Sequence, residues 1–107
     1  VIVDIRKGSP TFGKHISILL NDKNNQHVFI PRGYAHGYIT LSDQSIFYYK
    51  VDNYFEETCE KSIAYDDPKL KINWILSKSE LIVSQKDKNA YGLDEAVLFN
   101  YNRDLYD

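Results

Sequence analysis

The sequence predicts an all-β domain, an antiparallel sandwich or barrel, and three observations support this fold class. Short runs of β-branched and aromatic residues recur along the chain, and turn-forming residues separate them at short intervals. The aromatic content is high, with nine tyrosines, five phenylalanines and one tryptophan, which suits half-buried pleated surfaces. A chain of 107 residues suffices for one core, so residues 1–107 are expected to form a single domain.

Seven segments are predicted to be strands, because each is rich in β-branched or aromatic residues. They span residues 1–6, 15–21, 27–31, 37–41, 46–51, 60–65 and 71–74. The clearest breaks between them are residues 7–10, 21–25, 42–44 and 66–68. These breaks carry Gly, Pro, Asn or Asp, which favour chain reversals. Hairpins rather than helices are therefore expected to connect the strands.

The C-terminal part of the chain has a different pattern. Residues 92–99 place acidic side chains early and apolar side chains at helical spacing. This pattern predicts a short C-terminal helix that covers a sheet edge.

One turn segment, PRGYAHGY at residues 31–38, carries a histidine in an unusual setting. Pro31 fixes its own φ and closes the preceding strand, and Gly33 allows a tight reversal. His36 then begins the next apolar run, so its ring is aimed along that strand. From this motif alone two readings stay open: His36 faces a ligand, or it only satisfies a turn carbonyl.

Composition excludes several classes of function. The formal net charge is −2, which gives no basic field for nucleic acid, and no apolar stretch is long enough to cross a membrane. Neither nucleic acid nor a membrane is therefore expected as a partner. A single cysteine, Cys59, allows no internal disulfide and fits a reducing compartment. The chain is expected to be cytoplasmic.

Metal and nucleophilic chemistry are also not expected. The three histidines, at positions 15, 27 and 36, include no closely spaced pair, although metal sites of β-barrels depend on clustered ligands. Cys59 has no histidine near it in sequence, and the chain has no Gly-x-Ser-x-Gly elbow and no glycine-rich phosphate loop. Acid–base chemistry is the remaining enzymatic option.

Several segments, in a fixed order, carry a resemblance to a known family. They are DIR at 4–6, SPTFG at 9–13, IPRGYAHGY at 30–38, YKVDNY at 49–54, DP at 67–68, INW at 72–74 and SQKD at 84–87. Together they resemble the dTDP-4-dehydrorhamnose 3,5-epimerases from residue 1 to about residue 93. The number and order of these segments make a chance resemblance improbable.

The resemblance implies a cupin-like jelly roll, usually a homodimer, that works without a cofactor. Such an enzyme inverts C3 and C5 of dTDP-4-keto-6-deoxy-glucose to give dTDP-4-keto-L-rhamnose. The reaction removes a proton next to a ketone, so the C4 carbonyl holds the charge as an enolate. A neutral histidine can act as the base, and a phenol can return the proton from the opposite face.

The resemblance also implies roles for individual residues. Tyr49 matches the catalytic acid, and its unperturbed phenol pKa of about 10 keeps it protonated at neutral pH. Asp87 matches the carboxylate that pairs with the base histidine and sets its tautomer. The residues implied to bind the substrate are His36 and Lys86, at the diphosphate, and Tyr54 and Phe55, against the nucleotide or sugar. The family often has tyrosine where this chain has Phe55, so one polar contact is absent.

One part of the family pattern cannot be assigned. The family carries Arg-Gly-x-His, which supplies the base, before the stretch that corresponds to Val1. The chain is therefore expected to be N-terminally incomplete, without the base histidine and inactive by itself. The alternatives are a related ketoisomerase or single-centre epimerase, a non-catalytic carbohydrate-binding cupin, and a metal-dependent cupin oxygenase.

Overall fold

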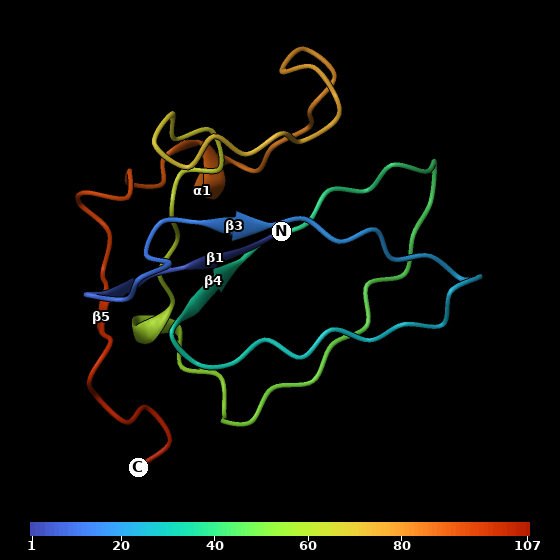
Figure 1. Cartoon of the computed structure of the whole chain (residues 1–107). Helices are drawn as coiled ribbons and strands as arrows, with labels where there is room; N and C mark the ends of the chain where they lie inside the picture. Colours follow the sequence, from blue (N-terminus) through green and yellow to red (C-terminus); the bar gives the residue numbers. More distant parts are fainter.

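The computed structural model describes all residues from 1 to 107 and contains two small sheets with very little helix (Figure 1). The elements are β1 (Ile2–Asp4), β2 (Arg6–Lys7), β3 (His15–Ile16), β4 (Tyr34–His36), the 3₁₀ turn η1 (Glu57–Cys59), α1 (Gln85–Lys88) and β5 (Phe99–Asn100). One sheet has the order β3-β1-β4, and the other pairs β2 with β5. The fold is therefore of the all-β class. No helix has the length and apolar character needed to span a membrane.

The three-stranded sheet is antiparallel, and β1 lies at its centre. Ile2 of β1 faces Ile16 on one side and His36 on the other. The pairing of β1 with β4 continues past the assigned ends, because the Gly37 N–H donates to the Val1 carbonyl at 3.1 Å. The Val1 ammonium donates back to the Gly37 carbonyl at 2.9 Å. This ladder fixes the position of His36 relative to β1.

The hydrophobic core is small and lies against β1. Its four buried apolar residues are Val3, Ile5, Leu70 and Leu93. Partly buried side chains extend it, namely Val1, Phe12, Ala35, Ile63, Ile72 and Leu98. Strand β1 and the segments around Leu70 and Leu93 therefore hold the structured part of the chain together.

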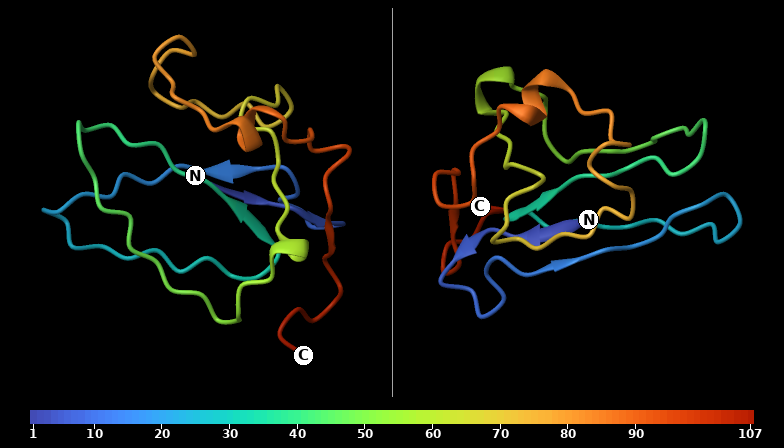
Figure 2. Two further views of the ribbon diagram at one scale, coloured as in Figure 1. Left: turned by 180° about the vertical axis from the view of Figure 1, so that it is seen from behind. Right: turned by 90° about the horizontal axis from the view of Figure 1, so that it is seen from above.

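Two long arms leave the three-stranded sheet on the side away from β5 (Figures 1 and 2). The first arm comprises residues 17–32 between β3 and β4, and the second arm comprises residues 38–55 after β4. None of the 27 backbone–backbone hydrogen bonds involves a residue of either arm. Both arms are consequently open segments without a strand partner.

The predicted strands are correct only near the sheet. Residues 1–6 contain β1 and the start of β2, and residues 15–21 contain β3, which ends at Ile16. The predicted strand at 37–41 is wrong, because the strand there, β4, precedes it. No regular strand forms at 27–31, 46–51, 60–65 or 71–74; a single bridge joins Ile63 to Tyr91. A strand needs a neighbouring backbone, and these segments lack one along most of their length.

The predicted helix at 92–99 is also wrong. Asp67 accepts the Leu93 N–H at 2.6 Å, and the Phe99 N–H donates to the Ile5 carbonyl at 3.2 Å, so tertiary contacts hold this segment in a non-helical path. Its last residue, Phe99, begins β5 (Phe99–Asn100), which is parallel to β2. The short helix lies earlier, at α1, where Ser84 caps the first turn by accepting the Asp87 N–H.

The C-terminal end packs beside the turn before β4 through Arg32. The Arg32 guanidinium donates to the Leu105 carbonyl at 2.8 Å and to the Asp52 carboxylate at 2.9 Å. Tyr106 accepts the Arg32 backbone N–H at 3.0 Å, and its ring lies 5.0 Å from the guanidinium carbon. Arg32 thus connects the end of the chain to the second arm.

Candidate functional site

The best-organised polar cluster of the structure surrounds Asp4, which is 3% exposed. One carboxylate oxygen accepts from the Arg6 Nε at 2.9 Å and the other from the Arg6 Nη2 at 2.9 Å. The hydroxyls of Ser9 and Thr11 each donate to the second oxygen at 2.6 Å. This carboxylate is buried with several donors, which is the arrangement that makes a buried charge tolerable.

The Arg6 side chain joins this cluster to two other parts of the chain. Its guanidinium carbon lies 4.5 Å from the ring centre of Tyr34 and 5.0 Å from that of Tyr101. Arg6 also donates to the Tyr34 hydroxyl at 2.5 Å. Cation–π contacts of this kind favour a fixed guanidinium. Arg6 thereby connects β1, β4 and the segment after β5.

Electrostatics keep both groups of this pair charged. Hydrogen bonds from Arg6 hold the pKa of the Asp4 carboxyl well below its ordinary value, with help from Ser9 and Thr11 and against the opposing effect of burial. The same hydrogen bond to Asp4 raises the pKa of Arg6 above its ordinary value. In the sequence, DIR stands out only as part of the family resemblance, and no role is predicted from it for this cluster. The sequence signal that indicates such a cluster is an acidic residue between two apolar ones, Asp4, followed by Arg6 and by a Ser-x-Thr turn at residues 9–11.

Two of the predicted site residues, His36 and Tyr49, lie near a row of neighbouring aromatic rings. Exposed side chains alternate at positions 36, 38 and 40, so His36 and Tyr38 lie on the same face of the extended chain. The Tyr38 ring stacks on Phe47 at 4.0 Å between ring centres. Phe47 in turn lies 5.4 Å from Tyr49. Tyr38, Phe47 and Tyr49 thus lie on one face of the second arm, and His36, at the end of β4, precedes them on the same face. Tyr48 has the opposite parity.

The other four predicted residues lie on exposed segments. Asp87, in α1, accepts the Ser84 hydroxyl at 2.8 Å, so its carboxylate completes a helix cap in this structure. Lys86 forms an ion pair with Glu60, which follows η1. Tyr54 and Phe55, at the end of the second arm, are almost fully and largely exposed, respectively.

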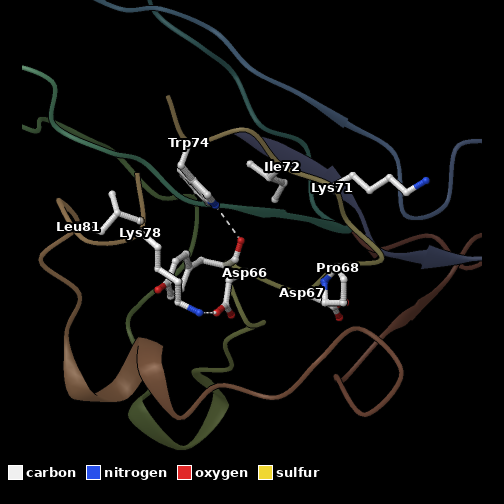
Figure 3. Close-up of a pocket in the computed structure, with 9 residues that line it drawn as sticks. Asp66, Asp67, Pro68, Lys71, Ile72, Trp74, Lys78 and Leu81 are labelled. Carbon is white, nitrogen blue, oxygen red and sulfur yellow. Dashed lines mark hydrogen bonds and ion pairs between the residues drawn. The ribbon is translucent and has the colours of Figure 1, made fainter. Parts of the chain in front are cut away.

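No hydrogen bond, ion pair or ring pair joins any two of the six predicted residues directly. A cavity of about 220 Å³ lies elsewhere (Figure 3). Trp74 closes one side of it and donates to the Tyr65 carbonyl at 2.8 Å, and Lys78 pairs with Asp66 at 2.8 Å. None of the six residues lines this cavity. The structure therefore does not bring the six predicted residues together.

The structure contains no group of three or more His, Cys, Asp or Glu side chains placed to hold a metal ion. Cys59 is exposed and has a free thiol.

Comparison with known proteins identifies the class to which this β-sheet and its aromatic row belong. The family model for dTDP-4-dehydrorhamnose 3,5-epimerase matches residues 1–95. The match spans nearly the whole chain and includes all the motif segments from DIR to SQKD. The chain belongs to the dTDP-4-dehydrorhamnose 3,5-epimerase family.

Individual relatives agree with this assignment. The chain is 41% identical over 97 residues to a dTDP-4-dehydrorhamnose 3,5-epimerase of Escherichia coli (strain K12), covering 91% of this chain and 52% of the relative. It is 43% identical over 98 residues to the Salmonella typhimurium enzyme of the same name, covering 92% and 53%. A Methanothermobacter thermautotrophicus relative of that name is 41% identical over 100 residues, covering 92% and 54%. The chain thus spans about half the length of these curated relatives. No solved structure gives a significant match.

Proposed function

We propose that the protein is a nucleotide-sugar 3,5-epimerase that converts dTDP-4-keto-6-deoxy-glucose to dTDP-4-keto-L-rhamnose. The observation that carries this proposal is the family match over residues 1–95 together with the aromatic row that leads from His36 to Tyr49. The relatives carry this activity in their names. The reaction belongs to the route that makes activated L-rhamnose for cell-surface polysaccharide, in the cytoplasm.

The chemistry requires two groups on opposite faces of the sugar. A base removes the proton from C5 or C3, and the bonding electrons move onto the C4 carbonyl oxygen as an enolate. An acid then donates a proton to the same carbon from the other face, so protons and electrons balance without any cofactor. Tyr49 is the proposed acid, because a phenol hydroxyl can donate its proton to the carbon that becomes inverted. Asp87 is the proposed partner of the base histidine.

The base comes from outside the matched segments. None of the three histidines follows an Arg-Gly pair, so we assign the base to the half of the relatives that this chain does not match. Lys86 and His36 would hold the diphosphate. Tyr54 and Phe55 would pack against the nucleotide or the sugar of the substrate. Asp87 and Lys86 then have to exchange the contacts they make here, to Ser84 and Glu60, for contacts to the base histidine and the substrate.

The same proposal includes a jelly-roll sandwich and a homodimer for the complete protein. The antiparallel order β3-β1-β4 and the two open arms are compatible with a second layer of strands. The apolar side chains that the arms expose would form the interior of that sandwich.

Tyr49 gives the direct test of the proposal. The chain is reconstituted with the unmatched half of a relative, and epimerised product is followed by NMR with dTDP-4-keto-6-deoxy-glucose in deuterated water. Tyr49→Phe should reduce product formation by at least about 100-fold, the lower range of a general acid's contribution. Tyr48→Phe removes an identical hydroxyl from the opposite face and should leave the rate within about threefold.

Equal activity of the two variants would refute the acid assignment and favour a carbohydrate-binding protein. Deuterium incorporation at one carbon alone would instead favour a single-centre epimerase. The 107-residue chain by itself should incorporate no deuterium, because the base is absent from it.

A further inference from the structure

We propose that Arg32 is a positioning residue that clasps the end of the second arm to the C-terminal tail, residues 101–107. The clasp holds Tyr54 and Phe55, at the end of that arm, in one place relative to the sheet. This inference rests on the proposed function only for what the two rings contact. The clasp itself is a property of the chain and can be tested without substrate.

The Arg32 side chain is the point where the two arms and the tail meet. Its Nε donates to the Asp52 carboxylate at 2.9 Å, and its Nη1 donates to the Leu105 carbonyl at 2.8 Å. The Tyr106 ring lies 5.0 Å from the guanidinium carbon, and the Tyr106 hydroxyl accepts the Arg32 backbone N–H at 3.0 Å. A planar guanidinium has several donors in fixed directions, so one side chain holds two segments at once. A lone exposed ion pair contributes little, but contacts that converge on one group act as a network.

The tail is anchored to the sheet before it reaches the clasp. Strand β5 pairs with β2, and the Tyr101 N–H donates to the Lys7 carbonyl at 3.0 Å. The Tyr101 ring also lies 5.0 Å from the guanidinium carbon of Arg6. Further along, Leu105 packs against the turn before β4, since a Cβ atom on Gly33 would lie 2.9 Å from its side chain. The tail thus runs from the sheet to that turn (Figures 1 and 2) and gives the clasp a fixed support.

The end of the second arm has no other polar contact with the rest of the chain. Within residues 50–55, Asp52 alone bonds to another segment. The one further hydrogen bond there is local, from the Tyr54 N–H to the Asn53 side chain. The Tyr54 and Phe55 side chains are exposed, so packing does not hold them. Because Tyr54 follows Asp52 by two residues, its Cα stays within about 7 Å of the Asp52 Cα, and a fixed Asp52 restricts where both rings lie.

The tail side of the clasp lies beyond the segment that identifies the family. The family model matches residues 1–95, and none of the motifs from DIR to SQKD includes the tail. Leu105 and Tyr106 therefore add a support that the family pattern does not specify. The proposed acid, Tyr49, makes no contact with the clasp. Loss of the clasp is thus expected to weaken substrate binding and to leave proton transfer intact.

The first test uses the full 107-residue chain without substrate. Arg32→Gln removes the guanidinium, and NMR relaxation should show the backbone order parameters of residues 52–55 falling from about 0.85 to below about 0.6, the range of flexible backbone. Arg103→Gln is the matched control in the tail, because Arg103 bonds only through its backbone N–H, to the Asn100 carbonyl. The control should leave these order parameters unchanged. Unchanged order in Arg32→Gln would overturn the clasp.

A double variant tests whether Asp52 is the group that Arg32 holds. Asp52→Asn should loosen the same residues as Arg32→Gln. Combining the two changes should loosen them no further, because both break one contact. Additive effects would show that the two side chains act independently and would overturn the clasp.

The second test uses the reconstituted protein and the substrate of the Tyr49 experiment. Arg32→Gln should raise KM at least about fivefold and leave kcat within about twofold, which is the signature of lost binding without lost chemistry. An unchanged KM despite a loosened arm, or an equal fall in kcat, would overturn the positioning role and leave the epimerase reaction standing. Absence of epimerisation in the unsubstituted protein would instead contradict the proposed function, and the relaxation test would still decide the clasp.

Discussion

At the scale of single residues, the buried pair of Asp4 and Arg6 is the most constrained interaction of the chain. Asp4 is almost fully buried, while the Arg6 side chain keeps 23% of its surface exposed. Removing one partner of such a pair leaves a charge without compensation, which costs more than the pair contributes in the first place. The cluster therefore matters to stability mainly as a set that must stay complete.

Asp4→Asn is expected to destabilise the fold by about 3–5 kcal/mol, because it leaves Arg6 without its carboxylate. Urea unfolding followed by circular dichroism measures the change. Asp94→Asn is the control, since it breaks an exposed ion pair with Lys69 and should hardly move the midpoint. Equal shifts for the two variants would show that the buried cluster has no special role.

The same carboxylate predicts how stability depends on pH. The pKa of Asp4 is lower in the folded chain than in the unfolded chain, mainly because of Arg6. Its stabilisation is therefore fully present above the unfolded pKa of about 4 and is lost as the pH falls toward the lower folded value. The urea midpoint should decline from pH 5 to pH 3, and Asp4→Asn should flatten that decline.

Gly33 tests the packing of the Arg6 side chain. A Cβ atom on Gly33 would lie 2.9 Å from side-chain carbons of Arg6 and Leu105, while one on Gly8 would meet only Tyr101 at 3.9 Å. Both glycines have positive φ, 91° and 92°, so the backbone cost of alanine, about 1–2 kcal/mol, is shared. Gly33→Ala should therefore be less stable than Gly8→Ala by about 1–3 kcal/mol, which is the usual cost of overpacking. Equal unfolding midpoints would contradict the tight contact.

The six site residues stay a prediction, because no contact joins any two of them in this chain. The sequence motifs single out His36 and Tyr49, and their common face follows from parity and the Tyr38–Phe47 stack. Tyr49 and Asp87 lie on segments far apart in the sequence, so no local pattern predicts how they are placed relative to each other. The Asp4 cluster was missed since its value depends on burial, which a short motif does not reveal.

At the scale of elements, tertiary contacts decide the structure of the C-terminal segment. Its apolar spacing favours a helix, yet Asp67 captures the Leu93 N–H and β2 pairs with β5. The actual helix, α1, followed a signal that was present in the sequence, Ser84 three residues before Asp87. Local caps were thus more reliable than apolar periodicity. Predicted strands formed only where a second strand came within reach.

Asp67→Ala is expected to release the segment after Tyr91 from its non-helical path. Hydrogen bonds from Leu93 and Lys69 to this carboxylate hold its pKa below the ordinary value, and their loss should cost about 1.5–3 kcal/mol. Amide exchange of Leu93 should accelerate along with a lower urea midpoint. Asp66→Ala is the matched control, since the Asp66 carboxylate is next in sequence and binds only the exposed Lys78. Unchanged exchange at Leu93 would show that β5 alone fixes this segment.

At the scale of the whole molecule, the balance between buried and exposed apolar surface defines the behaviour of the chain. Only four apolar residues are buried, although the sequence is 43% hydrophobic. Local composition predicts the all-β class, but regular strands form only where a neighbouring backbone lies within reach. The strands predicted at 27–31, 37–41, 46–51, 60–65 and 71–74 therefore do not form, although these segments are rich in β-branched and aromatic residues.

The urea dependence of unfolding measures this imbalance, because its slope, the m-value, scales with the surface exposed on unfolding. The isolated chain hides little apolar surface in its folded state, so its m-value should fall below about 1 kcal/mol/M, the lower end for small domains. A steep slope in the isolated chain would mean that the arms pack in solution without a partner, and the sandwich proposed for the complete protein would then lose its physical basis.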